Sequence, residues 1–122
     1  MCIRDSHLAD HFDALKPWTP RLVSELNGQH VRLARLEGEF IWHQHAEEDE
    51  LFLVLQGSFE MHLRDGIQRI GEGDLFVVPR GVEHKPVAPE PCTVLIFEPA
   101  SVRNTGEIEN ERTIDPDQLE AL

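Results

Sequence analysis

The sequence predicts an all-β domain, folded as an antiparallel sandwich or jelly-roll β-barrel, with a short helical segment before it and a polar tail after it. Three observations support this prediction. After Pro20, short runs rich in Val, Ile, Leu and Phe are separated every few residues by Gly, Pro or Asp. Several of the separating segments have the composition of tight hairpin turns. The 122 residues suffice for a single domain with one core.

The first 20 residues precede the predicted strands. Met1–Ser6 read MCIRDS, which looks like the translation of an adapter used to prepare sequencing libraries, so these residues carry no information about the fold. On this interpretation the chain is a metagenomic gene fragment without its native start. The apolar residues Leu8, Phe12 and Leu15 recur at spacings of four and three, which predicts a short helix. The predicted divisions are 1–6 (adapter artefact), 7–20 (N-terminal segment), 21–99 (domain) and 100–122 (tail).

Eight short runs are predicted to be β-strands. They span residues 21–26, 29–37, 40–45, 50–56, 58–64, 68–70, 75–78 and 92–98. The pairs Asn27-Gly28 and Asp65-Gly66 supply the positive φ angles that tight hairpins require, so neighbouring strands are antiparallel. Beyond Pro99 the chain becomes polar, and Asp115-Pro116 could cap and start a short helix.

The composition excludes some classes of function. The formal net charge of −12 would repel nucleic acid backbones and anionic lipid surfaces, so neither is an expected partner. No apolar run approaches the roughly 20 residues that span a bilayer, and no signal peptide is visible, which predicts a cytoplasmic protein. Cys2 and Cys92 form neither a disulfide framework nor a Cys-x-x-Cys motif.

Four residues have the chemistry of a metal site. His43 and His45 are two apart on the predicted strand 40–45, so both imidazoles should point to the same face. Glu50 opens the next strand, and His84 follows a Pro- and Gly-containing turn that can direct its ring inward. Three imidazoles and one carboxylate suit one divalent transition metal ion (Zn, Fe, Mn, Ni, Co or Cu), with positions left for water or substrate.

These residues also fill two spaced motifs through which the chain resembles the cupin family. The first motif takes Gly38, His43, His45, Glu50 and Gly57, and the second takes Gly73, Pro79, Gly81 and His84. Ala88 stands where the family often has Asn, and four residues instead of five separate Gly38 from His43. The resemblance runs from about Leu33 to Pro99. It is strongest to small single-domain type-2 cupins described as mannose-6-phosphate isomerase-like, whose pattern the run 102–106 also fits.

Strand parity assigns the remaining side chains to two faces. The predicted walls of a substrate pocket are Phe52, Val54, Phe59 and Met61. Glu98, at the end of the last predicted strand, is the candidate acid or base, and no other catalytic residue is identified. The opposite face is predicted to carry Phe40, Trp42, Leu51, Leu53 and Leu55. Because this face is too apolar for water, we expect the N-terminal segment or a second subunit to cover it, and we favour a homodimer.

Three functions follow from these features. The first is a metal-dependent enzyme that acts on a small sugar or sugar acid, where the ion stabilises an enediolate during isomerisation. The second is an Fe- or Cu-dependent oxidative enzyme, dioxygenase-like or acting on a sugar or polysaccharide. The third is a non-catalytic module that binds a ligand or metal. The chain has no Tyr, so cupin epimerases and lyases that use a tyrosine acid or base are poor matches.

Overall fold

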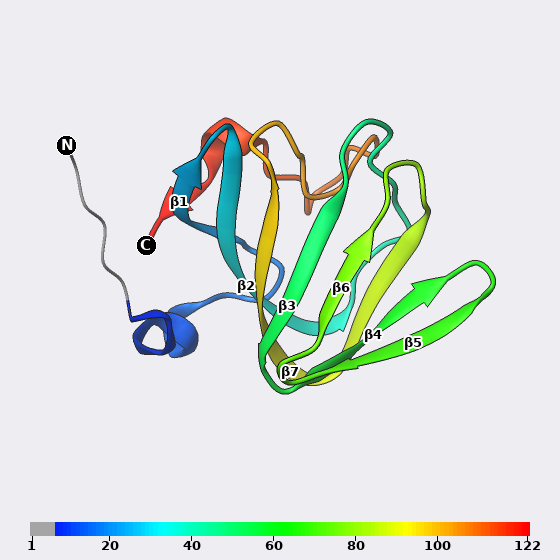
Figure 1. Cartoon of the computed structure of the whole chain (residues 1–122), viewed down its shortest axis with the longest axis horizontal. Coiled ribbons are helices and arrows are strands. Elements are labelled where there is room, and N and C mark those ends of the chain that lie inside the picture. Colours follow the sequence, from blue (N-terminus) through cyan, green and yellow to red (C-terminus); the bar gives the residue numbers. More distant parts are fainter. Residues whose placement is uncertain (1–6) are drawn as a thin grey trace.

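The computed structural model describes residues 7–122, and the predicted adapter residues 1–6 lie outside this range. Within residues 7–122 the chain forms eight β-strands and two short 3-10 helices (Figure 1). The elements in chain order are η1 (Leu8–Ala14), β1 (Arg21–Leu26), β2 (Gln29–Glu39), β3 (Glu50–Gln56), β4 (Ser58–Leu63), β5 (Gly66–Gly71), β6 (Leu75–Val78), β7 (His84–Pro99), η2 (Pro116–Gln118) and β8 (Glu120–Ala121).

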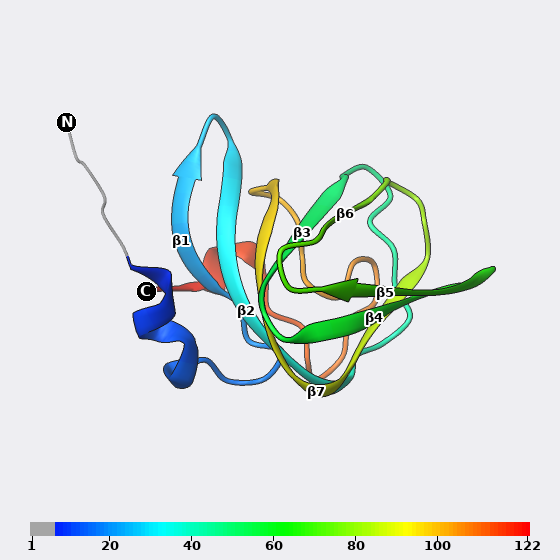
Figure 2. The ribbon, with the colours of Figure 1, turned by 60° about the horizontal axis from the view of Figure 1, so that its bottom comes forward.

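The strands form one curved sheet in the order β5-β4-β7-β2-β1-β8, and β3 pairs with both β7 and β6. The pairs are antiparallel, except that β8 runs parallel to β1. The long strand β7 pairs with β4 through its first residues, with β3 through its second half and with β2 through most of its length. The sheet therefore curves around one interior without closing, as Figure 2 shows, and the prediction of a jelly-roll fold is confirmed.

Two hydrophobic clusters hold the sheet in this shape. The larger fills the interior and contains Ala34, Leu36, Phe52, Val54, Phe59, Met61, Ile70, Val78, Ala88, Cys92, Val94 and Ile96. The smaller lies on the outer side of β1 and β2, where Leu8, Phe12 and Leu15 of the N-terminal segment pack near Leu33. Leu15 is buried and Leu8 and Phe12 are partly buried in this cluster, so the N-terminal segment covers an outer face of the sheet.

The structure corrects three details of the strand prediction. Residues 40–45 do not form a strand and belong to the connection between β2 and β3. Strand β7 begins at His84 instead of Cys92. The turn between β4 and β5 consists of Arg64 and Asp65, and Gly66 there does not have a positive φ, whereas Asn27 and Gly28 do.

The residues after β7 fold back onto the sheet. Val102 and Thr105 are fully buried, and β8 adds a short edge to β1. Helix η2 begins after Asp115 with the predicted cap, since Asp115 and Gln118 form a capping box. No helix in the described part of the chain combines the length and the apolar character needed to cross a membrane.

Candidate metal centre

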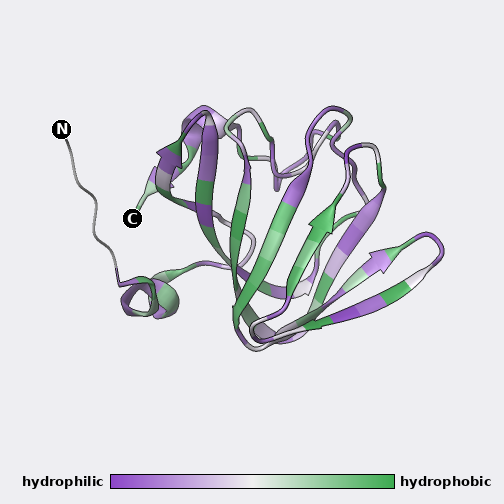
Figure 3. Ribbon diagram, in the orientation of Figure 1, coloured by the Kyte–Doolittle hydropathy of each residue, from purple (hydrophilic) through white to green (hydrophobic). Residues whose placement is uncertain are grey.

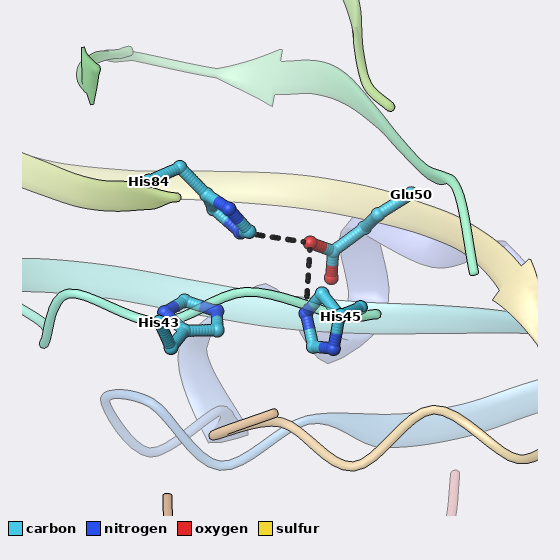
Figure 4. Close-up of side chains that lie close together, drawn as sticks. All are labelled: His43, His45, Glu50 and His84. Carbon is cyan, nitrogen blue, oxygen red and sulfur yellow. Dashed lines mark ion pairs between the residues drawn. The ribbon is translucent and has the colours of Figure 1, made fainter. Parts of the chain in front are cut away.

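The structure brings the four predicted ligands together on one side of the interior. One ligand atom from each of His43, His45, Glu50 and His84 lies within 4.8 Å of the others, and all four residues are buried (Figure 4). The residues come from the β2–β3 connection, the first position of β3 and the first position of β7. A cluster of three imidazoles and one carboxylate is a suitable donor set for a divalent transition metal.

His43 is positioned by its partner ligand instead of by a strand of its own. The backbone N–H of His43 donates to the carbonyl of His84 (3.0 Å), and the N–H of His84 donates to the carbonyl of His43 (2.9 Å). This isolated antiparallel bridge sets the two imidazole rings 4.2 Å apart between their centroids. The predicted convergence of His43 with the other ligands therefore holds, although the predicted strand does not exist.

The predicted turn before His84 holds the other end of the ligand-bearing loop. The N–H of Gly81, which has a φ of +78°, donates to the carbonyl of His45 (2.8 Å). The neighbouring N–H of Arg80 donates to the carboxylate of Asp49 (2.8 Å), and the two side chains also form an ion pair. Asp49 thus fixes the turn against the loop, a role that its position in an acidic run does not reveal.

Hydrogen bonds to the backbone select the imidazole nitrogens that face the centre. The Nδ1 atom of His43 lies 2.9 Å from the carbonyl of Ile41, and that of His84 lies 2.9 Å from the carbonyl of Val82. Because a carbonyl only accepts, Nδ1–H is the donor in each ring and Nε2 keeps its lone pair for a metal.

The fit to a metal is also seen in atoms that lack other partners. Among the described residues, His45 Nε2, Glu50 Oε1 and His84 Nε2 are buried without a hydrogen bond of acceptable geometry. The two nitrogens lie 3.4 and 3.3 Å from Glu50 Oε1, so the three atoms converge without satisfying one another. Buried polar atoms normally have partners, and a divalent ion would supply one for all of them.

Burial and the neighbouring charges set the protonation states of His43 and Glu50 to those that bind a cation. Burial, followed by the nearby His84, lowers the pKa of His43 to about 4, so this ring is neutral at physiological pH. Burial alone would raise the pKa of Glu50, but the imidazoles of His45 and His84 close to its carboxylate hold it well below its usual range. Neutral imidazoles beside an ionised carboxylate are the protonation states that bind metal.

A small cavity adjoins the metal centre. Its volume is about 40 Å³ and its lining is mostly apolar. The lining residues are Trp18, Pro20, Arg32, Ala34, Leu36, Phe40, His43, Glu50, Phe52, Pro86, Ile96, Glu98 and Asn104. Of the predicted pocket walls, Phe52 lines the cavity, whereas Val54, Phe59 and Met61 lie in the core away from it.

Glu98 enters this cavity from β7 as a buried carboxylate outside the ligand set. Its Oε2 atom lies 2.6 Å from Nη1 of Arg32, and both side chains are about 2% exposed. Its Oε1 atom has no partner among the described residues. Burial, followed by the charge of the neighbouring Glu50, raises the pKa of Glu98 well above its usual range, and Arg32 opposes this shift. The sequence signal for Arg32 is a cation directly between the apolar residues Val31 and Leu33 of β2.

Trp18 and Phe40 form one wall of the cavity, although neither is among the predicted pocket residues. Trp18 and Phe40 stack with ring centroids 4.8 Å apart, and the Trp18 indole N–H donates to the carbonyl of Glu37 (2.8 Å). Phe40 therefore faces the cavity, and its predicted outward position is wrong because residues 40–45 do not alternate as a strand. Trp18 has a φ of +58°, which is costly for a bulky residue and concentrates strain at this wall.

Comparison with known proteins identifies the family. The cupin domain model matches residues 29–98, which is more than half of the chain, and the chain belongs to this family. A crystal structure of a cupin-2 domain protein from Shewanella frigidimarina is 40% identical, with a TM-score of 0.75 over 77% of this chain and 93% of that one. The structure of KdgF from Halomonas sp. is 30% identical, with a TM-score of 0.58 over 65% of this chain and 74% of that one.

A relative from Bacillus subtilis (strain 168), named YdbB, has a similar sequence. It is 38% identical over 64 residues, which make up 52% of this chain and 57% of that protein. The chain therefore spans little more than half of the length of this relative. The chain is a cupin with a four-residue candidate metal site, which agrees with the resemblance that the two sequence motifs indicate.

Proposed function

We propose that this cupin is a metal-dependent enzyme that isomerises a small sugar or sugar acid. The observation that carries the proposal is Glu98, a buried carboxylate in the cavity beside Glu50 that is not one of the four ligands. A site that only stores or senses a metal has no need for a second buried carboxylate, whose desolvation is costly. An isomerase needs such a group to move a proton.

In this isomerisation the metal ion, Glu98 and Arg32 have different roles. When bound, a divalent ion supplies Lewis-acid stabilisation of negative charge on adjacent substrate oxygens. Glu98 accepts the proton from the hydroxyl-bearing carbon and returns it to the neighbouring carbonyl carbon, and the hydroxyl proton passes to the former carbonyl oxygen. Substrate and product then have the same composition, and no oxidant is consumed. Arg32 holds the Glu98 carboxylate through Oε2, which leaves Oε1 for the proton transfer.

The cavity limits how such a substrate binds. Its volume of about 40 Å³ is far below the roughly 300 Å³ or more of an ordinary small-molecule pocket. Only the reacting carbonyl end of a sugar would enter, and the rest of the molecule would lie against the Trp18–Phe40 wall. Aromatic faces of this kind pack well against the apolar side of a sugar ring.

A Glu98→Gln substitution tests the proposal. In a screen of aldoses, sugar phosphates and uronates without oxygen, the wild-type protein should convert at least one compound. Glu98→Gln should lower kcat for it by roughly 100-fold or more, the usual contribution of a general acid or base, and leave the metal content unchanged. Glu83→Gln, at an exposed carboxylate paired with Arg64, serves as the control. Turnover that requires oxygen would favour the oxidative alternative, and turnover by Glu98→Gln at the wild-type rate would contradict the role of Glu98.

We also propose that the protein is a homodimer formed through the outer face of β6 and β3. Strand register aligns Val77 with Leu51 and Phe97, and Leu75 with Leu53 and Leu95. These aligned residues form rows that run across the strands. The N-terminal segment covers the part of the rows near β2, whereas on β6 Leu75 is 58% and Val77 46% exposed. Figure 3 shows β3 and β6 as largely hydrophobic. Apolar edge strands that face solvent tend to associate.

Light scattering tests this assembly. The wild-type protein should have the mass of two 14.0 kDa chains, and Val77→Lys should reduce it to one. Ile67→Lys places the same charge at an exposed apolar position on β5 and should leave the mass unchanged. A wild-type mass of one chain would contradict the proposal.

A further inference from the structure

The segment that follows β7 lies directly against the loop that carries two of the metal ligands. We call residues 100–114 the C-terminal strap. The β2–β3 connection, residues 40–49, contains His43 and His45 and has no regular strand structure. On one side it is held by β7 and by the turn at Gly81, through hydrogen bonds to Pro86, His84 and Gly81. The strap contacts its other side.

Three contacts connect the strap to this connection and its two ends. Arg112 donates from Nη1 to the carbonyl of Glu39 (2.7 Å), immediately before the connection, and its guanidinium lies 5.6 Å from the Phe40 ring centroid. Ser101 donates to the carboxylate of Glu48 (2.5 Å) near the other end. Between them, Gly106 lies against Gln44, the residue between the two histidine ligands.

The Gly106 contact leaves no room for a side chain. A Cβ atom at this position would collide with the carbonyl oxygen of Gln44 and lie 3.0 Å from its carbonyl carbon. Both colliding atoms belong to the backbone, so they cannot be relieved by rotating a side chain. Gly106 also has a φ of +64°, a conformation that other residues adopt only at a cost.

The strap itself is anchored in the interior, so it can act as a rigid support. The buried guanidinium of Arg32 donates to the carbonyls of Val102 (2.9 Å) and Ala100 (3.3 Å), and also binds Glu98. Val102 and Thr105 are fully buried. Asn104 closes the strap by binding the carbonyl of Arg112 and the N–H of Ile114, and it lines the cavity.

From these contacts we propose that the C-terminal strap is part of the metal centre and that Gly106 is a positioning residue for His43 and His45. The inference rests on the proposed metal site and adds the element that fixes the ligand spacing. A Cβ at position 106 would displace Gln44, and the ligands on either side of it would move with the backbone. Residues that orient ligands from outside the ligand set typically contribute 10- to 100-fold to metal affinity.

Titration of the metal-free protein with Co²⁺ alone, followed by calorimetry and visible absorption, tests the inference. Gly106→Ala should bind Co²⁺ roughly 10-fold or more weakly, and its absorption bands should shift because the ligand geometry changes. The matched control is Gly73→Ala, since Gly73 also has a positive φ (+84°) but a Cβ there would meet nothing within 4 Å. Both substitutions should lower the melting temperature of the metal-free protein through backbone strain, but Gly73→Ala should keep the wild-type affinity and spectrum.

If Gly106→Ala does not fold, a double variant of the strap and its matched control test the inference instead. Ser101→Ala with Arg112→Met removes two strap contacts without a steric clash and should weaken Co²⁺ binding roughly threefold. Ser58→Ala with Arg69→Met removes a comparable surface contact between β4 and β5 and should have no effect. Strap variants that bind Co²⁺ like the wild type, with the same spectrum, would overturn the inference alone. Wild-type protein that binds no Co²⁺ would overturn both the metal site and the inference.

Discussion

Removal of a divalent metal should lower the melting temperature of the wild-type protein by roughly 15 °C. A ligand that binds only the folded state stabilises it by about 4 kcal/mol when its free concentration is 1,000 times Kd, and each kcal/mol moves the transition of a domain of this size by several degrees. The effect is large here because the ion would satisfy three buried polar atoms, on His45, Glu50 and His84, that otherwise lack partners. Calorimetric melting with and without a chelator measures the difference.

Substitution of one ligand should abolish the stabilisation by metal. His84→Ala removes a fully buried ligand, so its melting temperature should be the same with metal and with chelator. His62→Ala, at a partly exposed histidine on β4 outside the centre, should respond to metal like the wild type. An equal response to metal in His84→Ala and the wild type would contradict the assignment of His84 as a ligand.

The metal-free protein should lose stability as the pH falls from about 6.5 to about 4. Burial lowers the pKa of His43 from 6.5 to about 4 in the folded state. Between these values the unfolded chain takes up a proton that the folded chain does not, so acid favours unfolding and the contribution of His43 is complete only above pH 6.5. The difference between the two pKa values corresponds to about 3 kcal/mol. Glu50, whose pKa is depressed in the folded state, adds a loss in the same direction at lower pH.

Urea unfolding of the metal-free protein at several pH values measures this effect. The free energy of unfolding should decline across the window in the wild type. His43→Asn has no titrating ring at this position. Between pH 6.5 and 4.5 its free energy of unfolding should therefore fall less than that of the wild type, by most of the about 3 kcal/mol. A wild-type stability that stays constant from pH 7 to pH 4 would mean that His43 is not protected from protonation.

The ligand set could be predicted from the sequence more reliably than the structure that holds it. The spacing of His43, His45 and Glu50 and the turn before His84 indicate a shared site, and the structure brings these residues together. The strand predicted for residues 40–45 places His43 on a regular strand. In the structure a single bridge to His84 positions it, and a bridge between residues 41 positions apart leaves no local pattern in the sequence. The outward position predicted for Phe40 is wrong for the same reason.

Long-range features account for the other differences. The sequence predicts the last strand only from Cys92, but β7 also includes Pro86, Pro89 and Pro91, because proline is tolerated in a strand where no hydrogen bond from its nitrogen is needed. Likewise, the polar composition after Pro99 predicted only a tail. Its attachment depends on Arg32, a residue about 70 positions earlier whose role appears only when β2 and β7 are paired.

The central claim is that His43, His45, Glu50 and His84 hold one divalent metal ion, and metal content tests it most directly. Elemental analysis of wild-type protein purified without added metal should find about one transition metal ion per chain and identify it. The double variant His43→Ala, His45→Ala, purified in parallel, should retain almost none. Equal metal content in the two proteins, or none in the wild type, would contradict the claim.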